Sequence, residues 1–179
     1  MSEFLLRRMT AADLPGVLRV QAECYRSDLL EGTEAFASRL ALSPATCWVA
    51  TSWDDRAALA AYLFTHPWPQ GSLPPLNGLL PQSAHDGTDT ATLTWFVHDM
   101  AVAPAGRGGG LAMRLYEAAL QSALDGGLRH SRLIAVQSAA PWWRRVGYVP
   151  VVAHPGSAYA EKLADYGPGA MMMERVLVA

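Results

Sequence analysis

Residues 102–116 read VAPAGRGGGLAMRLY, in which an arginine and three consecutive glycines directly precede a run with helical spacing. Glycine is costly in ordered backbone, because it loses more conformational freedom on folding than any other residue. Its use at the start of a helix therefore needs a compensating reason. The candidates are a tight turn, a close helix crossing, or an anion that approaches bare backbone N–H groups.

Three phosphate-binding templates can be compared with this loop. A P-loop requires Gly-Lys-Ser/Thr, and the segment contains no lysine. A dinucleotide fingerprint, G-x-G-x-x-G/A, fails in both registers, because its last position falls on Leu111 or on Met113. The pattern R-x-x-G-x-A is matched in order by Arg107, Gly108, Gly109, Gly110, Leu111 and Ala112. Of the three templates, this one alone fits the loop.

Hydrophobic patterns around the loop predict one mixed α/β domain. The apolar run at 93–102 predicts a strand too apolar for an exposed edge, and 109–125 predicts an amphipathic helix. A Pro/Gly-rich stretch of about 25 residues lies between the strand expected at 58–65 and the strand at 93–102. Such a stretch is typical of a binding loop or a disordered connection. Further strands are expected at 4–8, 47–52, 58–65, 132–137, 148–153 and 170–178, and further helices from Thr10 to about Tyr25, at 33–41 and at 139–146.

Two motifs resemble the GNAT superfamily of acyl-CoA-dependent N-acetyltransferases. Residues 102–112 match the family's pyrophosphate motif, and 135–148 (AVQSAAPWWRRVGY) is similar to its helix-and-strand signature. The strand at 93–102 is nearest in pattern to the arylalkylamine N-acetyltransferase branch. The resemblance implies a single N-acetyltransferase domain over 1–179, with a mixed, mostly antiparallel central sheet flanked by helices. Strands 93–102 and 132–137 would form the family's splayed parallel pair.

The resemblance also implies acetyl-CoA as cosubstrate and a set of coenzyme-binding residues. Glycines let a pyrophosphate reach the helix N-terminus without meeting Cβ atoms, and Arg107 can add a charge-assisted contact or shape the loop. Backbone N–H groups near the end of strand 93–102 would stabilise the oxyanion. Gln137 or Ser138 stands where the family often has asparagine, and either can contact the pantetheine arm. The residues implied in addition to the loop are Met100, Ala101, Val102, Ser138 and Trp143.

His98 is the favoured base, because the corresponding strand of arylalkylamine N-acetyltransferases carries a histidine that takes part in proton removal. The alternative for His98 is a histidine hydrogen-bonded within the sheet. Asp99 would point to the opposite face of a regular strand, whereas a bulge would bring both side chains together. Asp99 is then an alternative base, a recognition carboxylate for a cationic amine, or an orienter of a nearby loop.

The general acid is less defined, because Trp143 stands where many members have tyrosine. An indole N–H donates hydrogen bonds but is no useful proton donor. Tyr148 is the expected substitute, with Tyr159 and Tyr166 as further candidates. A thiolate, with a pKa of about 8.5, can also leave without an acid.

The composition of the chain limits the classes of partner and the cellular location that we expect. The net charge is −2 and no basic stripe occurs, which argues against nucleic acid. No apolar run approaches the roughly 20 residues of a membrane span. Two cysteines, Cys24 and Cys47, fit free thiols in a cytoplasmic protein, and no Cys/His spacing suggests a metal site. We expect a monomer or homodimer.

The predicted activity is transfer of acetyl from acetyl-CoA to the primary amine of a small molecule, by direct attack on the thioester. Two alternatives remain open. The acceptor can be a protein N-terminus, or the chain can be an acyl-CoA-binding regulatory or sensing module with little turnover.

Overall fold

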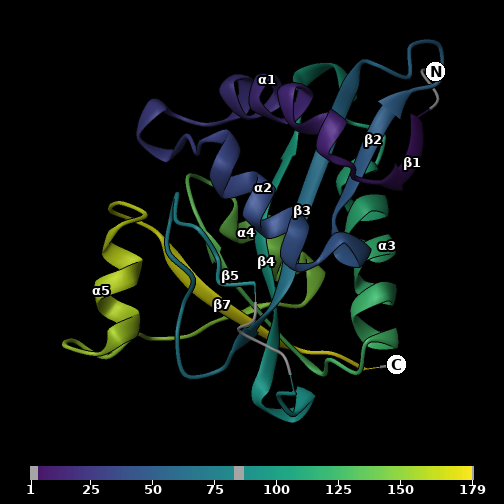
Figure 1. Cartoon of the computed structure of the whole chain (residues 1–179). Coiled ribbons are helices and arrows are strands. Elements are labelled where there is room, and N and C mark those ends of the chain that lie inside the picture. The colour runs from purple at the N-terminus through teal and green to yellow at the C-terminus, as the bar shows by residue number, and fades with distance from the viewer. Residues whose placement is uncertain (1–3, 83–86, 179) are drawn as a thin grey trace.

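A seven-stranded sheet runs through the protein, with helices on both faces (Figure 1). The structure, a computed structural model, describes residues 4–82 and 87–178. The strand order is β1-β2-β3-β4-β5-β7-β6, and only β4 and β5 pair in parallel among the described strands. The strands are β1 Phe4–Arg8, β2 Trp48–Ser52, β3 Leu59–Pro69, β4 Leu93–Val102, β5 His130–Ala135, β6 Val149–Pro150 and β7 Met171–Val176; the α-helices are α1 Leu14–Cys24, α2 Thr33–Leu42, α3 Leu111–Asp125, α4 Ala140–Val146 and α5 Ala158–Ala164.

The predicted fold class is confirmed, and the differences are local. β3 continues through Pro67 and Pro69, beyond the predicted end at 65. β2 pairs with β3 only as far as Leu63, so these prolines, which lack an N–H, interrupt no ladder on that side. β5 lies two residues earlier than predicted, because the backbone of Gln137 turns left-handed.

The last part of the chain departs furthest from expectation. Where a strand was expected at 148–153, β6 pairs only at Val149 and Pro150. Helix α5 was missed, although Ser157 caps it by accepting a hydrogen bond from the N–H of Ala160. The predicted helix at 109–125 begins at Leu111, because Gly110 is its left-handed N-cap.

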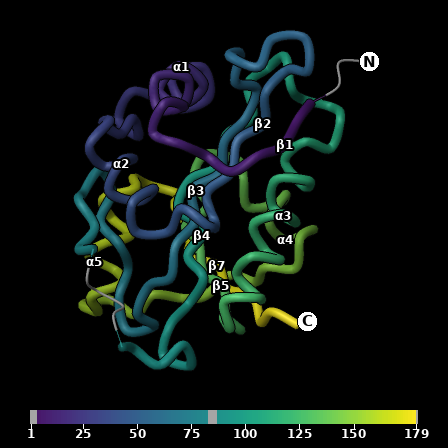
Figure 2. The backbone as a smooth tube through the Cα atoms, turned by 45° about the vertical axis from the view of Figure 1, so that its right-hand side comes forward, coloured from purple at the N-terminus to yellow at the C-terminus, as the bar shows by residue number. Residues whose placement is uncertain are grey.

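Two apolar layers enclose the sheet. Figure 2 shows α1 and α2 on one side of the strands and α3 and α4 on the other. Trp95 and Val97 of β4 belong to the core on the α3 and α4 side, whereas Ala101 and Ala103 belong to the core on the α1 and α2 side. Strand residues an even number of positions apart normally point to the same side of the sheet. Trp95 and Val97 point to the opposite side from Ala101 and Ala103, so the alternation of side chains changes between the two pairs.

A β-bulge at His98 causes this exchange. β4 pairs with β3 through Val97–Thr65 and then through Asp99–Phe64, which leaves His98 as one extra residue. One extra residue reverses the alternation of every side chain that follows. His98 and Asp99 therefore lie on the same side of the sheet, whereas a regular strand would have separated them.

Beyond the bulge the two parallel strands separate. β4 and β5 pair from Trp95–Ser131 to Val97–Leu133 and no further, although both strands continue. The predicted splayed parallel pair is thus confirmed. No helix among the described residues is long and apolar enough to cross a membrane.

Candidate active site

The separation of β4 and β5 opens a cavity of about 510 Å³. Its walls come from both strands, from the α1–α2 connection, from the turn before α4 and from the start of α3. The lining residues are Cys24, Tyr25, Leu29, Glu31, Leu76, Val97, His98, Asp99, Met100, Ala101, Val102, Arg107, Ala112, Leu133, Ile134, Val136, Gln137, Ser138, Ala139, Trp142, Trp143 and Tyr166.

Most of the predicted site residues meet at this cavity, and five do not line it. His98, Asp99, Met100, Ala101, Val102, Arg107, Ala112, Ser138 and Trp143 line it. Gly108, Gly109 and Gly110 form an exposed loop next to the lining residues Arg107 and Ala112, Leu111 is buried in the core, and Tyr148 lies away from the cavity.

The glycine loop has a backbone suited to an incoming anion. Gly108 and Gly110 have φ values of +87° and +72°, a backbone region that residues with a side chain rarely adopt. A Cβ at any of the three consecutive glycines would meet nothing within 4 Å, so the backbone stands open to solvent. The first N–H groups of α3, a 15-residue helix, follow directly. The residues present therefore fit a coenzyme pyrophosphate.

Arg107 ties this loop to the cavity wall. Its Nε donates to the carbonyl of Val102 at 3.1 Å, and its Nη2 lies 3.7 Å from Sγ of Cys24. The Cys24 thiol in turn donates to the same carbonyl at 3.3 Å. The guanidinium thus shapes the loop while remaining exposed at the edge of the cavity.

Asp99 is a carboxyl group with a pKa close to neutral. Burial, followed by the nearby Glu31 carboxylate, raises its pKa to about 7. The Tyr62 hydroxyl donates to Asp99 Oδ2 at 2.8 Å and opposes that shift in pKa. Close to neutral pH, Asp99 therefore exchanges between a protonated and an ionised form, as a general base must.

His98 is held in a different state. Burial, and then the positive charge of Arg39, lower the pKa of His98 well below its usual value. Its Nδ1 lies 2.8 Å from Nε2 of His66, and Nδ1 of His66 lies 3.0 Å from the carbonyl of Pro67. A carbonyl only accepts, so with both rings neutral His66 donates to Pro67 and His98 donates to His66. Nε2 of His98 is buried with no hydrogen-bond partner among the described residues.

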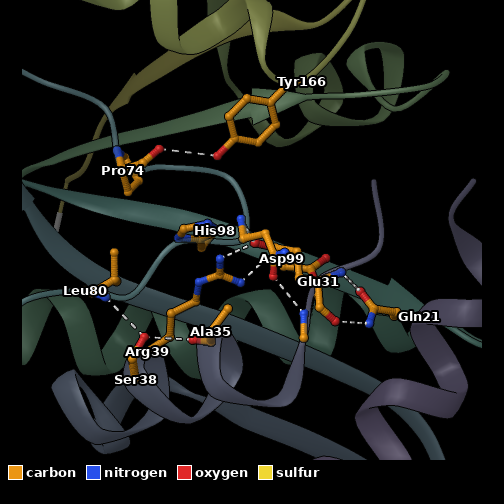
Figure 3. Close-up of polar contacts among 12 residues, drawn as sticks. Gln21, Glu31, Ala35, Ser38, Arg39, Pro74, Leu80, His98, Asp99 and Tyr166 are labelled. Carbon is orange, nitrogen blue, oxygen red and sulfur yellow. Dashed lines mark hydrogen bonds and ion pairs between the residues drawn. The ribbon is translucent and has the colours of Figure 1, made fainter. Parts of the chain in front are cut away.

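A buried ion pair lies beside these two residues. Glu31 lines the cavity, and both of its carboxylate oxygens accept hydrogen bonds from Arg39, one of them at 2.7 Å. Arg39 is 0% exposed, so its charge is balanced inside the protein. Figure 3 shows His98, Asp99, Glu31 and Arg39 gathered on one side of the sheet. Because Arg39 balances the charge of Glu31, the negative charge that these three groups can present to the cavity comes from the ionised form of Asp99.

Within 4–82 and 87–178, two residues other than glycine have left-handed backbones, and both adjoin the cavity. Asn77 has a φ of +50° and Gln137 a φ of +53°. The side chain of Gln137 accepts from the N–H of Arg26 and donates to the carbonyl of Cys24, each at 3.2 Å. It thereby joins the end of β5 to the end of α1. From the sequence, Gln137 or Ser138 is expected to contact the pantetheine arm. The side-chain amide of Gln137 is instead engaged in these two hydrogen bonds.

The tyrosines differ in their access to the cavity. The Tyr148 hydroxyl contacts Ser131 and Tyr116 in the core, and the side chain is 1% exposed. Tyr159 donates to the carbonyl of Gln70, outside the cavity. Tyr166 does line the cavity, and burial raises the pKa of its phenol. The expectation of Tyr148 as a proton donor therefore gains no support from the geometry.

Sequence patterns gave no sign of several lining residues. Tyr25, whose hydroxyl donates to the carbonyl of Met100 at 2.8 Å, stands at the end of a helix in an ordinary polar context. Glu31 and Leu76 lie in irregular connections that carry no motif. The Pro/Gly-rich stretch was the one usable signal, since it was predicted to be a binding loop or a disordered connection and contains Leu76. His66, Trp68, Tyr62 and Phe64 from the preceding strand are buried and do not line the cavity.

Comparisons with known proteins agree with this geometry. A family model described as "Acetyltransferase (GNAT) family" matches residues 14–148. A sequence comparison with curated proteins finds no match. Within the described residues, no group of three or more His, Cys, Asp or Glu side chains could hold a metal ion.

Three solved structures illustrate the range of proteins with this fold. A NatC complex bound to Gag peptide and CoA contains a chain with 12% identity and a TM-score of 0.71, with 98% of this chain and 99% of that chain covered. Arylalkylamine N-acetyltransferase 2 from Aedes aegypti has 12% identity and a TM-score of 0.66, covering 98% and 100%. GphF, a GNAT-like decarboxylase in complex with isobutyryl-CoA, has 16% identity and a TM-score of 0.66, covering 97% and 100%. At these identities the likeness extends to the fold alone.

Proposed function

Because the chain belongs to the acetyltransferase (GNAT) family, we propose that it transfers an acetyl group from acetyl-CoA to the primary amine of a small molecule. The observation that carries the proposal is the cavity between β4 and β5, which is lined by Arg107, next to the open glycine loop, and by the carboxyl groups of Asp99 and Glu31. We call the part of the cavity at Arg107 and the glycine loop the coenzyme end, and the part at Asp99 and Glu31 the acceptor end. An anionic coenzyme would bind at the first, and the Asp99 carboxylate would attract a cationic amine to the second.

The coenzyme end is supported by the helix α3 and its loop. The N–H groups at 108–112 would bind the pyrophosphate, and Arg107 would hold the loop in shape. Ser138, Trp142 and Trp143 would then contact the pantetheine arm as it enters the gap. The thioester carbonyl would lie beside Met100, Ala101 and Val102, whose backbone N–H groups are the candidate oxyanion donors.

The acceptor end supplies the proton acceptor. An amine arrives as an ammonium ion and must lose a proton before its nitrogen can attack the thioester carbon. The ionised Asp99 carboxylate attracts that cation and, with a pKa of about 7, can accept the proton. His98 is the other candidate base, but its lowered pKa makes it the weaker acceptor. The earlier preference for His98 stays a prediction.

The rest of the reaction needs little from the protein. The C–N bond forms as the C–S bond breaks, one nitrogen proton ends on the coenzyme sulfur, and the other is released to solvent. A thiolate leaves readily, so no acid is required. Of the three candidate tyrosines, Tyr166 is the one that lines the cavity, but its raised pKa makes its phenol a weak proton donor.

A second candidate function is an acyl-CoA-binding sensor with little turnover. The observation in its favour is Trp143, which lines the cavity at the family's tyrosine position while Tyr148 is turned into the core. For either function we propose a single domain over 1–179, a monomer or homodimer, and a cytoplasmic location.

The test is a panel of acceptors incubated with acetyl-CoA while free thiol is measured. The panel contains small primary amines, diamines and short peptides with free N-termini. Thiol release with small amines supports the proposal, and release with peptides alone would move the acceptor to a protein N-terminus. Tight binding of acetyl-CoA by calorimetry without release from any acceptor would overturn the enzyme and favour the sensor.

A further inference from the structure

The irregular segment after β3 reaches the acceptor end of the cavity, where the N–H of Asn77 bonds Glu31 and Leu76 lines the wall. Leu73 and Leu80 are each 3% exposed and pack in a core that includes Trp68, Phe96 and Met172. Leu76 lies between them and instead lines the cavity. The segment is thus anchored on both sides of the one leucine that reaches the site.

The turn that presents Leu76 requires particular residues at two positions. Asn77 adopts a φ of +50°, a left-handed conformation that asparagine tolerates better than most other residues with a Cβ. The next residue, Gly78, has no room for a side chain, because a Cβ there would lie 2.4 Å from Pro75. The conformation of this turn therefore depends on Asn77 and Gly78.

Two hydrogen bonds hold the turn against the acceptor end. Oδ1 of Asn77 accepts from the N–H of Gly32 at 2.8 Å, and the N–H of Asn77 donates to the Glu31 carboxylate. Glu31 is itself fixed by Arg39 and by both polar groups of the Gln21 side chain. The position of Leu76 is therefore coupled to the carboxylate that lies beside Asp99 (Figure 3).

The groups around Leu76 indicate what it would contact. Leu29 and Tyr166 also line the cavity and are mainly apolar, whereas Glu31 has its charge balanced by Arg39. Once an amine nitrogen is held at Asp99, the remaining carbon chain would extend along these side chains. Each methylene buried there is worth about 0.8 kcal/mol, or nearly fourfold in binding.

We propose that Leu76 is a specificity-determining residue, held by the Asn77 turn, that limits the length of the apolar group an acceptor amine can carry. This inference rests on the proposed function, in that the cavity is assigned to an amine. It assigns a role to a loop that carries no motif of its own.

The test uses linear primary alkylamines from ethylamine to octylamine. Their binding to protein saturated with coenzyme A is measured by calorimetry, and thiol release with acetyl-CoA is measured in parallel. We expect Leu76→Ala to favour the longer amines by at least tenfold relative to the wild type. Leu79→Ala removes a leucine from the same segment that is 64% exposed, and it should leave the length profile unchanged.

The turn is tested separately by hydrogen exchange. Asn77→Gly keeps the left-handed backbone and loses the bond to Gly32, whereas Asn77→Ala loses that bond and adds strain. We expect faster exchange across 72–80 in both variants, more in Asn77→Ala, with the acetyl-CoA affinity unchanged.

The outcomes separate this inference from the proposed function. Absence of thiol release by the wild type would overturn the proposed function, while the calorimetric length profile still decides the role of Leu76. An identical profile in the wild type and Leu76→Ala, in a variant that retains its melting temperature, would overturn the inference. So would unchanged exchange across 72–80 in both Asn77 variants.

Discussion

At the scale of single residues, the site depends on two neighbours that burial shifts in opposite chemical directions. Burial disfavours the charged form of each, so the pKa of Asp99 rises and that of His98 falls. The pKa of the carboxyl group is thereby brought close to neutral pH, whereas the pKa of the imidazole is moved away from it. This difference makes Asp99 the better match to a general base at neutral pH.

The first prediction concerns the pH profile of the reaction. In the wild type, kcat/KM should fall as the pH drops through about 7, because Asp99 becomes protonated. Asp99→Asn should lose about 10²–10⁴-fold and lack this limb, with partial recovery at high pH where the amine is already neutral. His98→Ala should lose less and keep the limb. The reverse pattern, measured by thiol release between pH 5 and 9, would exchange the two roles.

The second prediction concerns stability, because a raised pKa in the folded state destabilises the ionised protein. Asp99 ionises near 3.8 when unfolded and near 7 when folded. Its stabilising contribution is therefore complete below about pH 4 and is lost as the pH rises towards 7. Across that window the free energy of unfolding of Asp99→Asn should rise relative to the wild type by a few kcal/mol, at about 1.4 kcal/mol per pKa unit, and the difference in melting temperature should grow with it. A constant difference from pH 4 to 8 would contradict the shift.

At the scale of elements, the geometry is set by a bulge in β4 and by the loop that begins α3. The bulge places His98 and Asp99 on one side, and the divergence of β4 from β5 opens the gap beside them. The loop leaves its backbone open because Gly108 and Gly110 adopt left-handed conformations. Together they place an open, left-handed backbone next to the gap and the Asp99 carboxyl group in its wall.

The third prediction tests the loop. Gly110→Glu should weaken acetyl-CoA binding by at least tenfold, because a carboxylate would project beside the pyrophosphate site. Gly156→Glu is the matched control, since Gly156 has a similar φ of +77°, is equally open and does not line the cavity. Both variants should share the small cost of a left-handed residue. Equal acetyl-CoA affinities by calorimetry would remove the loop from the coenzyme site.

At the scale of the whole molecule, the buried pair of Glu31 and Arg39 links the α1–α2 connection to the cavity and to the segment after β3. Arg39 on α2 bonds Glu31, and Glu31 bonds the backbone of Asn77. Removal of one charge from such a pair leaves the other unpaired in the interior.

The fourth prediction follows from this pair. Arg39→Leu should destabilise the protein by about 3–5 kcal/mol. That corresponds to roughly 6–20 °C in melting temperature for a chain of this size. The double variant Arg39→Leu with Glu31→Gln should recover part of the loss, because no charge is left unpaired. A double variant as unstable as the single one would show that packing, and not charge, dominates at this position.

The sequence by itself determined the glycine loop, the strand and helix that flank it, and the order of most elements. These features are local, because the R-x-x-G-x-A pattern, the apolar run of β4 and the spacing of α3 each lie within one segment. The single domain with a splayed parallel pair followed from two such motifs and their resemblance to a known family. Helix α5 was local as well, capped by Ser157, and was overlooked.

The tertiary structure alone decided how the residues at the proposed acceptor end are arranged. The bulge at His98 arises from the register in which β3 and β4 pair, and no sequence pattern in β4 predicts it. The pKa of Asp99 depends on its burial and then on Glu31, which lies far away in sequence and reaches the cavity only when α2 packs on the sheet. Leu76 faces the cavity because Asn77 bonds Gly32 and Glu31 across more than forty positions. Local patterns record the conformation of a segment, whereas these contacts exist only once distant segments are packed together.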